Sequence, residues 1–206
     1  MRPMSPALLA ALEADAALPR DFMWITVRNR ETGEPMSYGA WSDLGGNTVD
    51  VIDPATGDEI SRTYRGIGGV LDVSPVALLS GLTVQTVTIT LNHIDEDMEL
   101  MLRGFDMRRA AIELHRGFLD PNTMRLIDAA VPRFSGFVDE APLTTPAEGQ
   151  EGVLTLICAS HTQDLVRSNS AKRSDADQRR RNPTDGFFRH AATVGGWKIT
   201  WGQSTE

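Results

Sequence analysis

The residues with the clearest chemical potential lie near the C-terminus, where Arg179, Arg180 and Arg181 follow one another. The segment Leu165–His190 holds seven Lys or Arg residues against three Asp, so it carries +4 in a chain whose net charge is −8. All other residues together therefore carry −12. Because guanidinium groups bind carboxylates and phosphates through charge-assisted hydrogen bonds, this reversal of charge indicates a contact surface.

The pattern around these arginines predicts a short helix from Asp175 to Arg181. Ser174, with Asp177 three residues later, resembles a capping box with Asp in place of Glu, and Asn182-Pro183 ends the helix. Three successive arginines spread around one helical turn. This arrangement suits several separate carboxylates better than one flat groove.

Aromatic residues follow the predicted helix and favour a protein partner. Phe187 and Phe188, with Trp197 and Trp201 further on, are too apolar for a free, solvated arm, which is the alternative interpretation. Nucleic acid is a weaker alternative, because the whole chain is acidic and the aromatic residues do not alternate with the basic ones as a stacking platform requires. The predicted interface consists of Lys172, Arg173, Asp175, Asp177, Arg179, Arg180, Arg181, Phe187, Phe188, Trp197 and Trp201.

The histidines and the densest acidic cluster do not predict a metal or acid–base site. No HxH or HxxxH spacing begins a zinc site among the four histidines, which are His93, His115, His161 and His190. The acidic cluster stands at the start of a predicted helix, where negative charge complements the helix dipole. Its members are Asp95, Glu96, Asp97 and Glu99.

Nucleotide-binding and nucleophile motifs are also missing from the sequence. Gly66-Ile67-Gly68-Gly69 lacks the third glycine of a dinucleotide loop, no Lys-Ser/Thr follows as in a P-loop, and no GxSxG elbow occurs. The single cysteine, Cys158, excludes a disulfide framework within the monomer and a multi-cysteine zinc or iron–sulfur site. We expect Cys158 to be a buried small hydrophobe. The sequence predicts no catalytic residue, no cofactor and no enzyme.

The elements that must position these residues are mostly short strands. A helix is expected from Pro6 to Leu18, with Ser5 as N-cap, and a short central helix follows the acidic cluster and ends at Gly104. Alternating apolar and polar residues predict strands at 22–30, 35–41, 47–52, 59–65, 82–93, 109–118, 133–139 and 152–160. The expected fold is mainly β, an antiparallel sandwich or barrel with an irregular helical C-terminal arm. Its expected parts are an N-terminal helix (1–20), a β-rich domain (21–164) and a basic docking arm (165–206).

The sequence also resembles a known family. KRSDADQRRRNPTDGFF followed by WKITWG is similar to a C-terminal signature of tail proteins of bacteriophages with long, non-contractile tails. Upstream, MWITV, SRTYRGIG, LTVQTVTITLN, GFDMRRAAIELHRGFLD and FSGFVD resemble tail-tip hub proteins of siphophages and gene transfer agents. The resemblance covers most of the chain from about Phe22 onward.

This resemblance implies a virion structural protein, made in the host bacterial cytoplasm, that forms a ring at the distal end of the tail tube. Its implied partners are further copies of itself, the distal tail ring and the large tip or fibre protein. A trimer is favoured and a hexamer remains open, and DNA would only pass through the acidic lumen. Some hub relatives carry an iron–sulfur cluster, which Cys158 alone cannot hold. The alternatives are a hexameric distal tail protein and a tail-associated hydrolase. No stretch approaches the roughly 20 apolar residues of a membrane span.

Overall fold

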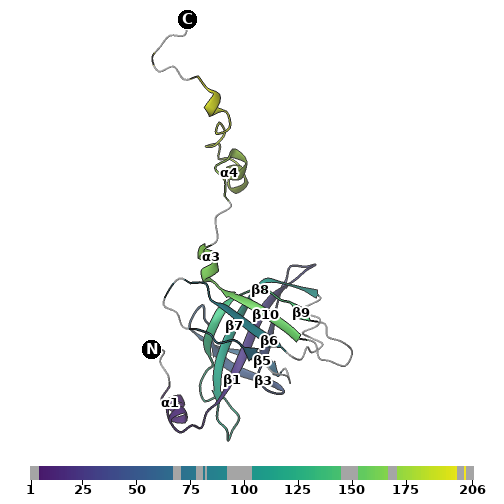
Figure 1. The fold of residues 1–206 in the computed structure, drawn as a ribbon, viewed down its shortest axis with the longest axis vertical. Coiled ribbons are helices and arrows are strands. Elements are labelled where there is room, and N and C mark those ends of the chain that lie inside the picture. The colour runs from purple at the N-terminus through teal and green to yellow at the C-terminus, as the bar shows by residue number, and fades with distance from the viewer. Residues whose placement is uncertain are drawn as a thin grey trace. The chain divides into compact units, whose positions relative to one another are not determined.

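The computed structural model describes residues 5–66, 71–77, 81, 83–91, 104–144, 153–166, 171–198 and 202. The chain divides into two compact units, residues 1–165 and 166–206, which we call the body and the arm. The body is mainly β, as expected, and its described strands form one ten-stranded sheet (Figure 1). The predicted central helix and the acidic residues Asp95, Glu96, Asp97 and Glu99 lie outside the described residues.

The body begins with a helix and continues with ten strands. The elements are α1 (Pro6–Glu13), β1 (Leu18–Asn29), β2 (Pro35–Trp41), β3 (Gly46–Ile52), β4 (Glu59–Gly66), β5 (Leu71–Val73), β6 (Thr86–Leu91), β7 (Phe105–Leu119), β8 (Val131–Glu140), β9 (Leu143–Thr144), β10 (Val153–Ser160) and α3 (Thr162–Val166). The predicted cap of α1 is confirmed, because the Leu8 amide donates to Ser5 Oγ at 3.2 Å. The helix ends earlier than predicted, and Asp15 turns the chain with a φ of 52° before β1 begins.

The sheet is mixed, so the expectation of purely antiparallel strands is wrong at one pair. The strand order is β3-β4-β2-β1-β7-β8-β10-β6-β5, with β9 beside β10. β2 and β4 pair in parallel through Ala40 with Arg65 and Trp41 with Gly66, because the β3–β4 hairpin returns β4 in the direction of β2. A side chain at Gly66 would collide with the backbone of Asp43, so glycine permits this close pairing.

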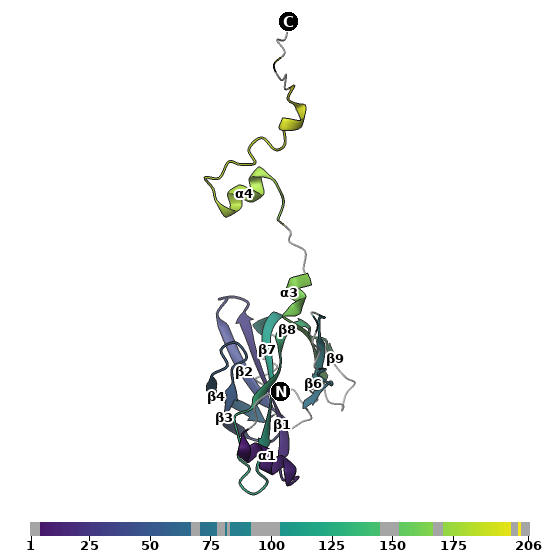
Figure 2. The same cartoon turned by 90° about the vertical axis from the view of Figure 1, so that its left-hand side faces the viewer.

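Strand β1 contributes to two apolar cores because its side chains alternate between the faces of the sheet. Met23, Ile25 and Val27 lie in the larger core, which includes side chains from β6, β7, β8 and β10. Phe22 lies in the smaller core, which is formed mainly by β2, β3, β4 and the flanks of β7 and β8. Figure 2 shows this division, with β2, β3 and β4 on one side of β1 and β7, and β6 and β9 on the other.

The edge strand β3 is joined to the residue that precedes β8. Ile52 donates its amide to the Ala130 carbonyl at 2.9 Å, and the Ala130 amide donates to the Asp50 carbonyl at 2.9 Å. These bonds satisfy backbone groups at one edge of the sheet and curl it around the smaller core. They also fix β3 next to the long connection between β7 and β8.

Candidate interaction surfaces

The arm contains the predicted helix, α4 (Asp175–Arg181), and its cap is confirmed. The Asp177 amide donates to Ser174 Oγ at 3.3 Å, and the Asp177 carboxylate accepts the Lys172 amide at 3.3 Å. Asn182 ends the helix in an extended conformation, as its position before Pro183 predicts. The signals that are local in sequence therefore predict both ends of α4.

Two of the three successive arginines are paired inside the helix. Arg179 Nε lies 2.9 Å from Asp175 Oδ2, and Arg181 Nη2 lies 2.9 Å from Asp177 Oδ2. The acidic residue precedes the basic one by four positions in each pair, which is the favourable order on a helix. Asp175 and Asp177 were predicted as part of an interface, and they have a local role here as partners of the arginines.

Side-chain hydrogen bonds also order the segment after α4. Gln178 Nε2 donates to Asp185 Oδ2 at 2.5 Å, and the Phe187 amide donates to Asp185 Oδ1 at 2.9 Å. These bonds lower the pKa of Asp185, with the bond from Gln178 as the largest cause. They turn the chain directly before the two phenylalanines, so the position of Phe187 relative to α4 is set by polar contacts.

The aromatic residues of the arm form pairs but remain exposed. The rings of Phe187 and Phe188 stand nearly perpendicular, with their centroids 5.0 Å apart. The ring centroids of His190 and Trp197 lie 5.1 Å apart. Phe187 is 82% exposed and Trp197 is 52% exposed. None of residues 171–198 is buried, whereas Trp201 lies outside the described residues. The described part of the arm is ordered by short-range bonds and has no core of its own.

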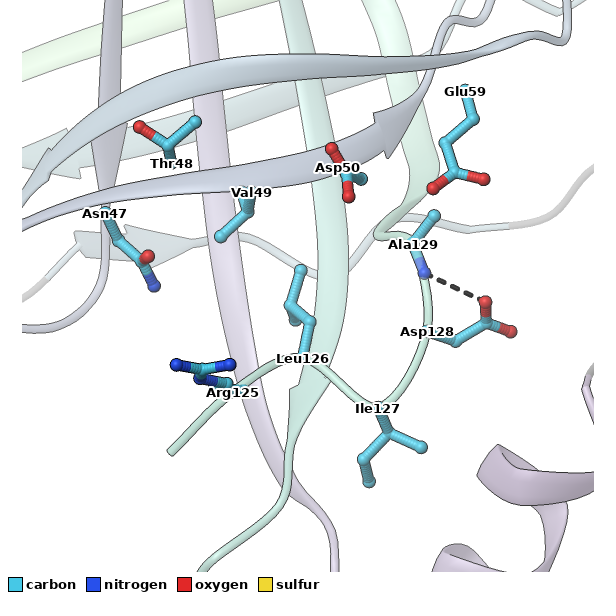
Figure 3. Close-up of a pocket in the computed structure, with 10 residues that line it drawn as sticks. All are labelled: Asn47, Thr48, Val49, Asp50, Glu59, Arg125, Leu126, Ile127, Asp128 and Ala129. Carbon is cyan, nitrogen blue, oxygen red and sulfur yellow. Dashed lines mark hydrogen bonds between the residues drawn. The ribbon is translucent and has the colours of Figure 1, made fainter. Parts of the chain in front are cut away.

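A groove on the body lies between β3 and the connection from β7 to β8 (Figure 3). Its volume is about 580 Å³, and its lining residues are Asn47, Thr48, Val49, Asp50, Glu59, Arg125, Leu126, Ile127, Asp128 and Ala129. Figure 3 shows Arg125 toward Asn47, whereas Glu59 and Asp128 lie at the other end beside Asp50. One end of the groove is therefore acidic.

The groove was not predicted from the sequence, because a non-local contact forms it. A strand is predicted at 47–52, and in β3 Val49 is buried whereas Asp50 is exposed. Nothing local indicates that Leu126 packs against the core beneath β3. Met124, with a φ of 54°, helps the connection to turn back toward that strand.

A polar cluster behind β3, beside the smaller core, consists of a partly buried ion pair and a fully buried histidine. Arg62 Nη1 lies 2.6 Å from Glu113 Oε2, and the Arg62 guanidinium stacks 4.8 Å from the centroid of the Trp24 ring. His115 is fully buried and donates from Nε2 to the Ile52 carbonyl at 3.0 Å. Burial lowers the pKa of His115, so the imidazole is neutral near pH 7 and joins β7 to β3.

Burial also weakens two acidic groups of the body, the Tyr64 hydroxyl and the Cys158 thiol. It raises the pKa of the Tyr64 hydroxyl to about 12, and it raises the pKa of the Cys158 thiol to about 12. Cys158 is buried in the larger core, as predicted. Both groups therefore stay protonated and neutral near pH 7.

The described residues contain no group of three His, Cys, Asp or Glu side chains that could hold a metal ion. His93, Gly68 and Gly69 lie outside the described ranges, as do the four acidic residues at 95–99. Among the helices that the structure describes, none is long and apolar enough to cross a bilayer.

Comparison with known proteins adds no relative: no protein-family model matches the sequence, and no curated protein matches it.

Proposed function

We propose that this chain is a structural subunit of a bacteriophage tail tip. In this role it is a hub-type ring component that joins the tail tube or distal tail ring to the tip or fibre proteins and surrounds the DNA channel. The observation that carries the proposal is the arm, whose described residues are ordered while none of them is buried. Such a segment presents apolar side chains that a partner molecule can cover.

The charge and architecture of the body support a ring around DNA. Residues 166–206 hold eight basic and four acidic side chains, so the body carries −12. A strongly negative surface repels phosphate and lets DNA pass without binding. The curled sheet with two cores suits the barrel or sandwich of a hub domain, in which the ring is built from rigid β subunits.

Exposed apolar side chains at two ends of the body support contacts on two sides. Leu9 and Leu12 of α1 are 49% and 37% exposed, and Leu165 of α3 is 71% exposed. Both views place α1 and α3 at opposite ends of the body (Figures 1 and 2). A subunit that joins a ring on one side to a tip protein on the other requires two such surfaces. A three-fold hub ring is the favoured assembly.

The test replaces the gene in the prophage that carries it with a version that stops after Val166. We expect the truncated body to fold and tails to be absent or to lack the tip in electron micrographs, because the docking arm is missing. Phe187→Ser with Trp197→Ser is expected to act in the same direction. The matched control is Leu44→Ser, which removes an apolar side chain that is 73% exposed on the body and is expected to leave tails normal. Normal tails from the truncated gene would overturn the proposal.

A further inference from the structure

We propose that the arm of one copy of this chain binds the acidic end of the groove beside β3 on a second copy. This inference rests on the ring role proposed above and names the partner of the arm within the ring. The contact joins two different surfaces, so each subunit both offers an arm and receives one. Such head-to-tail contacts generate closed rings when the rotation between neighbours closes.

Electrostatics favours a second copy as the partner. Each body carries −12 and each arm carries +4, so two bodies repel one another unless a cationic segment lies between them. The acidic end of the groove supplies exposed carboxylates from Asp50, Glu59 and Asp128. A basic arm seated there separates the negative bodies and neutralises part of their charge.

The groove also matches the apolar content of the arm. Val49, Leu126 and Ile127 line it beside the carboxylates, but Val49 is mostly buried, so the groove offers a small aliphatic surface within a mainly polar lining. The arm combines the same two properties with opposite charge, because Phe187 and Arg189 lie two residues apart. A volume of about 580 Å³ has room for an aromatic side chain and an adjacent guanidinium.

The walls of the groove are fixed before anything binds. The two backbone hydrogen bonds between β3 and Ala130 hold Asp50 in place, and the bond from His115 to Ile52 holds the end of the same strand. The Asp128 carboxylate accepts the amide of Ala129 at 2.9 Å, which orders the opposite wall (Figure 3). A preorganised site loses little conformational entropy when it binds a ligand.

The internal ion pairs of α4 select the cations that reach the groove. Arg179 and Arg181 are engaged with aspartates of their own helix. Arg180 and Arg189 are exposed and form no ion pair with any other residue that the structure describes. We therefore assign the intermolecular contacts with Asp50 and Glu59 to these two arginines, with Phe187 as the apolar anchor.

The test is a charge exchange in the full-length protein, measured by sedimentation velocity over a range of concentrations. Wild-type protein is expected to form a discrete oligomer that dissociates as salt is raised. The arm variant Arg180→Glu/Arg189→Glu and the groove variant Asp50→Lys/Glu59→Lys are each expected to weaken self-association at least about tenfold. One chain with all four substitutions is expected to regain most of the loss, because the charges are again opposite. Circular dichroism confirms that each variant is folded.

A matched control carries the same charge change elsewhere on the body. Glu31→Lys/Glu34→Lys lies in the exposed turn between β1 and β2 and is expected to leave the oligomer unchanged. A monomeric wild-type protein at all concentrations, including one whose arm folds onto its own body, overturns the inference. The inference is also overturned if the chain with all four substitutions associates no better than the arm variant or the groove variant alone.

The result is separable from that of the tail experiment. The arm and groove charge variants can associate like wild type while the truncated gene still blocks tail formation. In that case the arm binds another tail protein, and only the present inference fails. If the charge exchange works while the truncated gene gives normal tails, the inference stands and the tail role fails.

Discussion

His115 gives the body a pH-dependent stability that can be measured. It is fully buried with its Nε2 donating to the Ile52 carbonyl, and its removal from water favours the neutral imidazole. Burial lowers its pKa below the ordinary value of 6.5, although the hydrogen bond to Ile52 and the Glu113 carboxylate 3.8 Å away both favour the charged form. Arg62 already pairs with Glu113 and opposes protonation of the imidazole. Burial therefore determines the sign of the shift.

The sign and size of the effect follow from proton linkage. In the unfolded chain the histidine has a pKa of about 6.5, so between this value and the lower folded pKa the unfolded state binds more protons. Stability is then fully present above about pH 6.5 and falls as the pH is lowered toward the folded pKa. With an unfolded pKa of about 6.5, one such site lowers the free energy of unfolding by at most about 1.4 kcal/mol between pH 7.5 and 5.5.

Urea unfolding followed by tryptophan fluorescence measures this loss, because Trp24 and Trp41 pack against the smaller core that His115 borders. His115→Gln keeps a side-chain N–H donor for Ile52 and has no titration in this range. Its loss of unfolding free energy is therefore expected to be smaller than that of wild type, by at most about 1.4 kcal/mol. His161→Gln, at an exposed position, is the matched control and is expected to keep the wild-type loss. Equal losses in wild type and His115→Gln would refute the reasoning.

Two further predictions concern buried groups of the body. Glu113→Gln leaves the Arg62 guanidinium, which is only 12% exposed, without its carboxylate, so we expect it to lower the free energy of unfolding by about 2–4 kcal/mol. The double variant Glu113→Gln/Arg62→Met should regain at least half of the lost free energy of unfolding, measured by urea titration. If the two substitutions instead lowered the free energy of unfolding additively, this account would be contradicted. For Cys158, burial raises the thiol pKa to about 12, so an aromatic disulfide reagent at pH 8 should react at least about 100-fold more slowly with folded than with urea-unfolded protein. Equal rates would show that the thiol is accessible.

The features predicted correctly are those determined by neighbours in the sequence. Ser5 and Ser174 cap their helices because a hydroxyl needs only an amide three residues away. The alternation of Thr and aliphatic residues predicts a strand over 82–93, and β6 shows one buried face over Thr86–Leu91, whereas 83–85 precede the strand. Local chemistry is sufficient for these elements, so the sequence alone identifies them.

The features that were missed depend on contacts between distant segments. The parallel pairing of β2 with β4 follows from the route of the β3–β4 hairpin, and the groove follows from Ala130 bonding to β3 across about eighty residues of chain. His115 was considered only as a possible metal ligand, and its bond to Ile52 spans 63 residues. Residue type and spacing contain no direct record of such partners, because the fold brings them together.

The arginines of α4 show how local pairing changes the expected role of a basic segment. Three consecutive arginines suggest that charge dominates binding, but the ion pairs with Asp175 and Asp177 leave Arg180 as the cation of the triplet without a described ion pair. An isolated helix of seven residues is marginal in water, so these exposed pairs act mainly to favour the helical form. The apolar part of the proposed contact then falls to the exposed Phe187 and Trp197, because burying such side chains on a partner contributes more than a solvent-exposed ion pair. In the proposed contact, charge in the arm therefore selects and orients the partner, and the aromatic side chains are expected to supply most of the affinity.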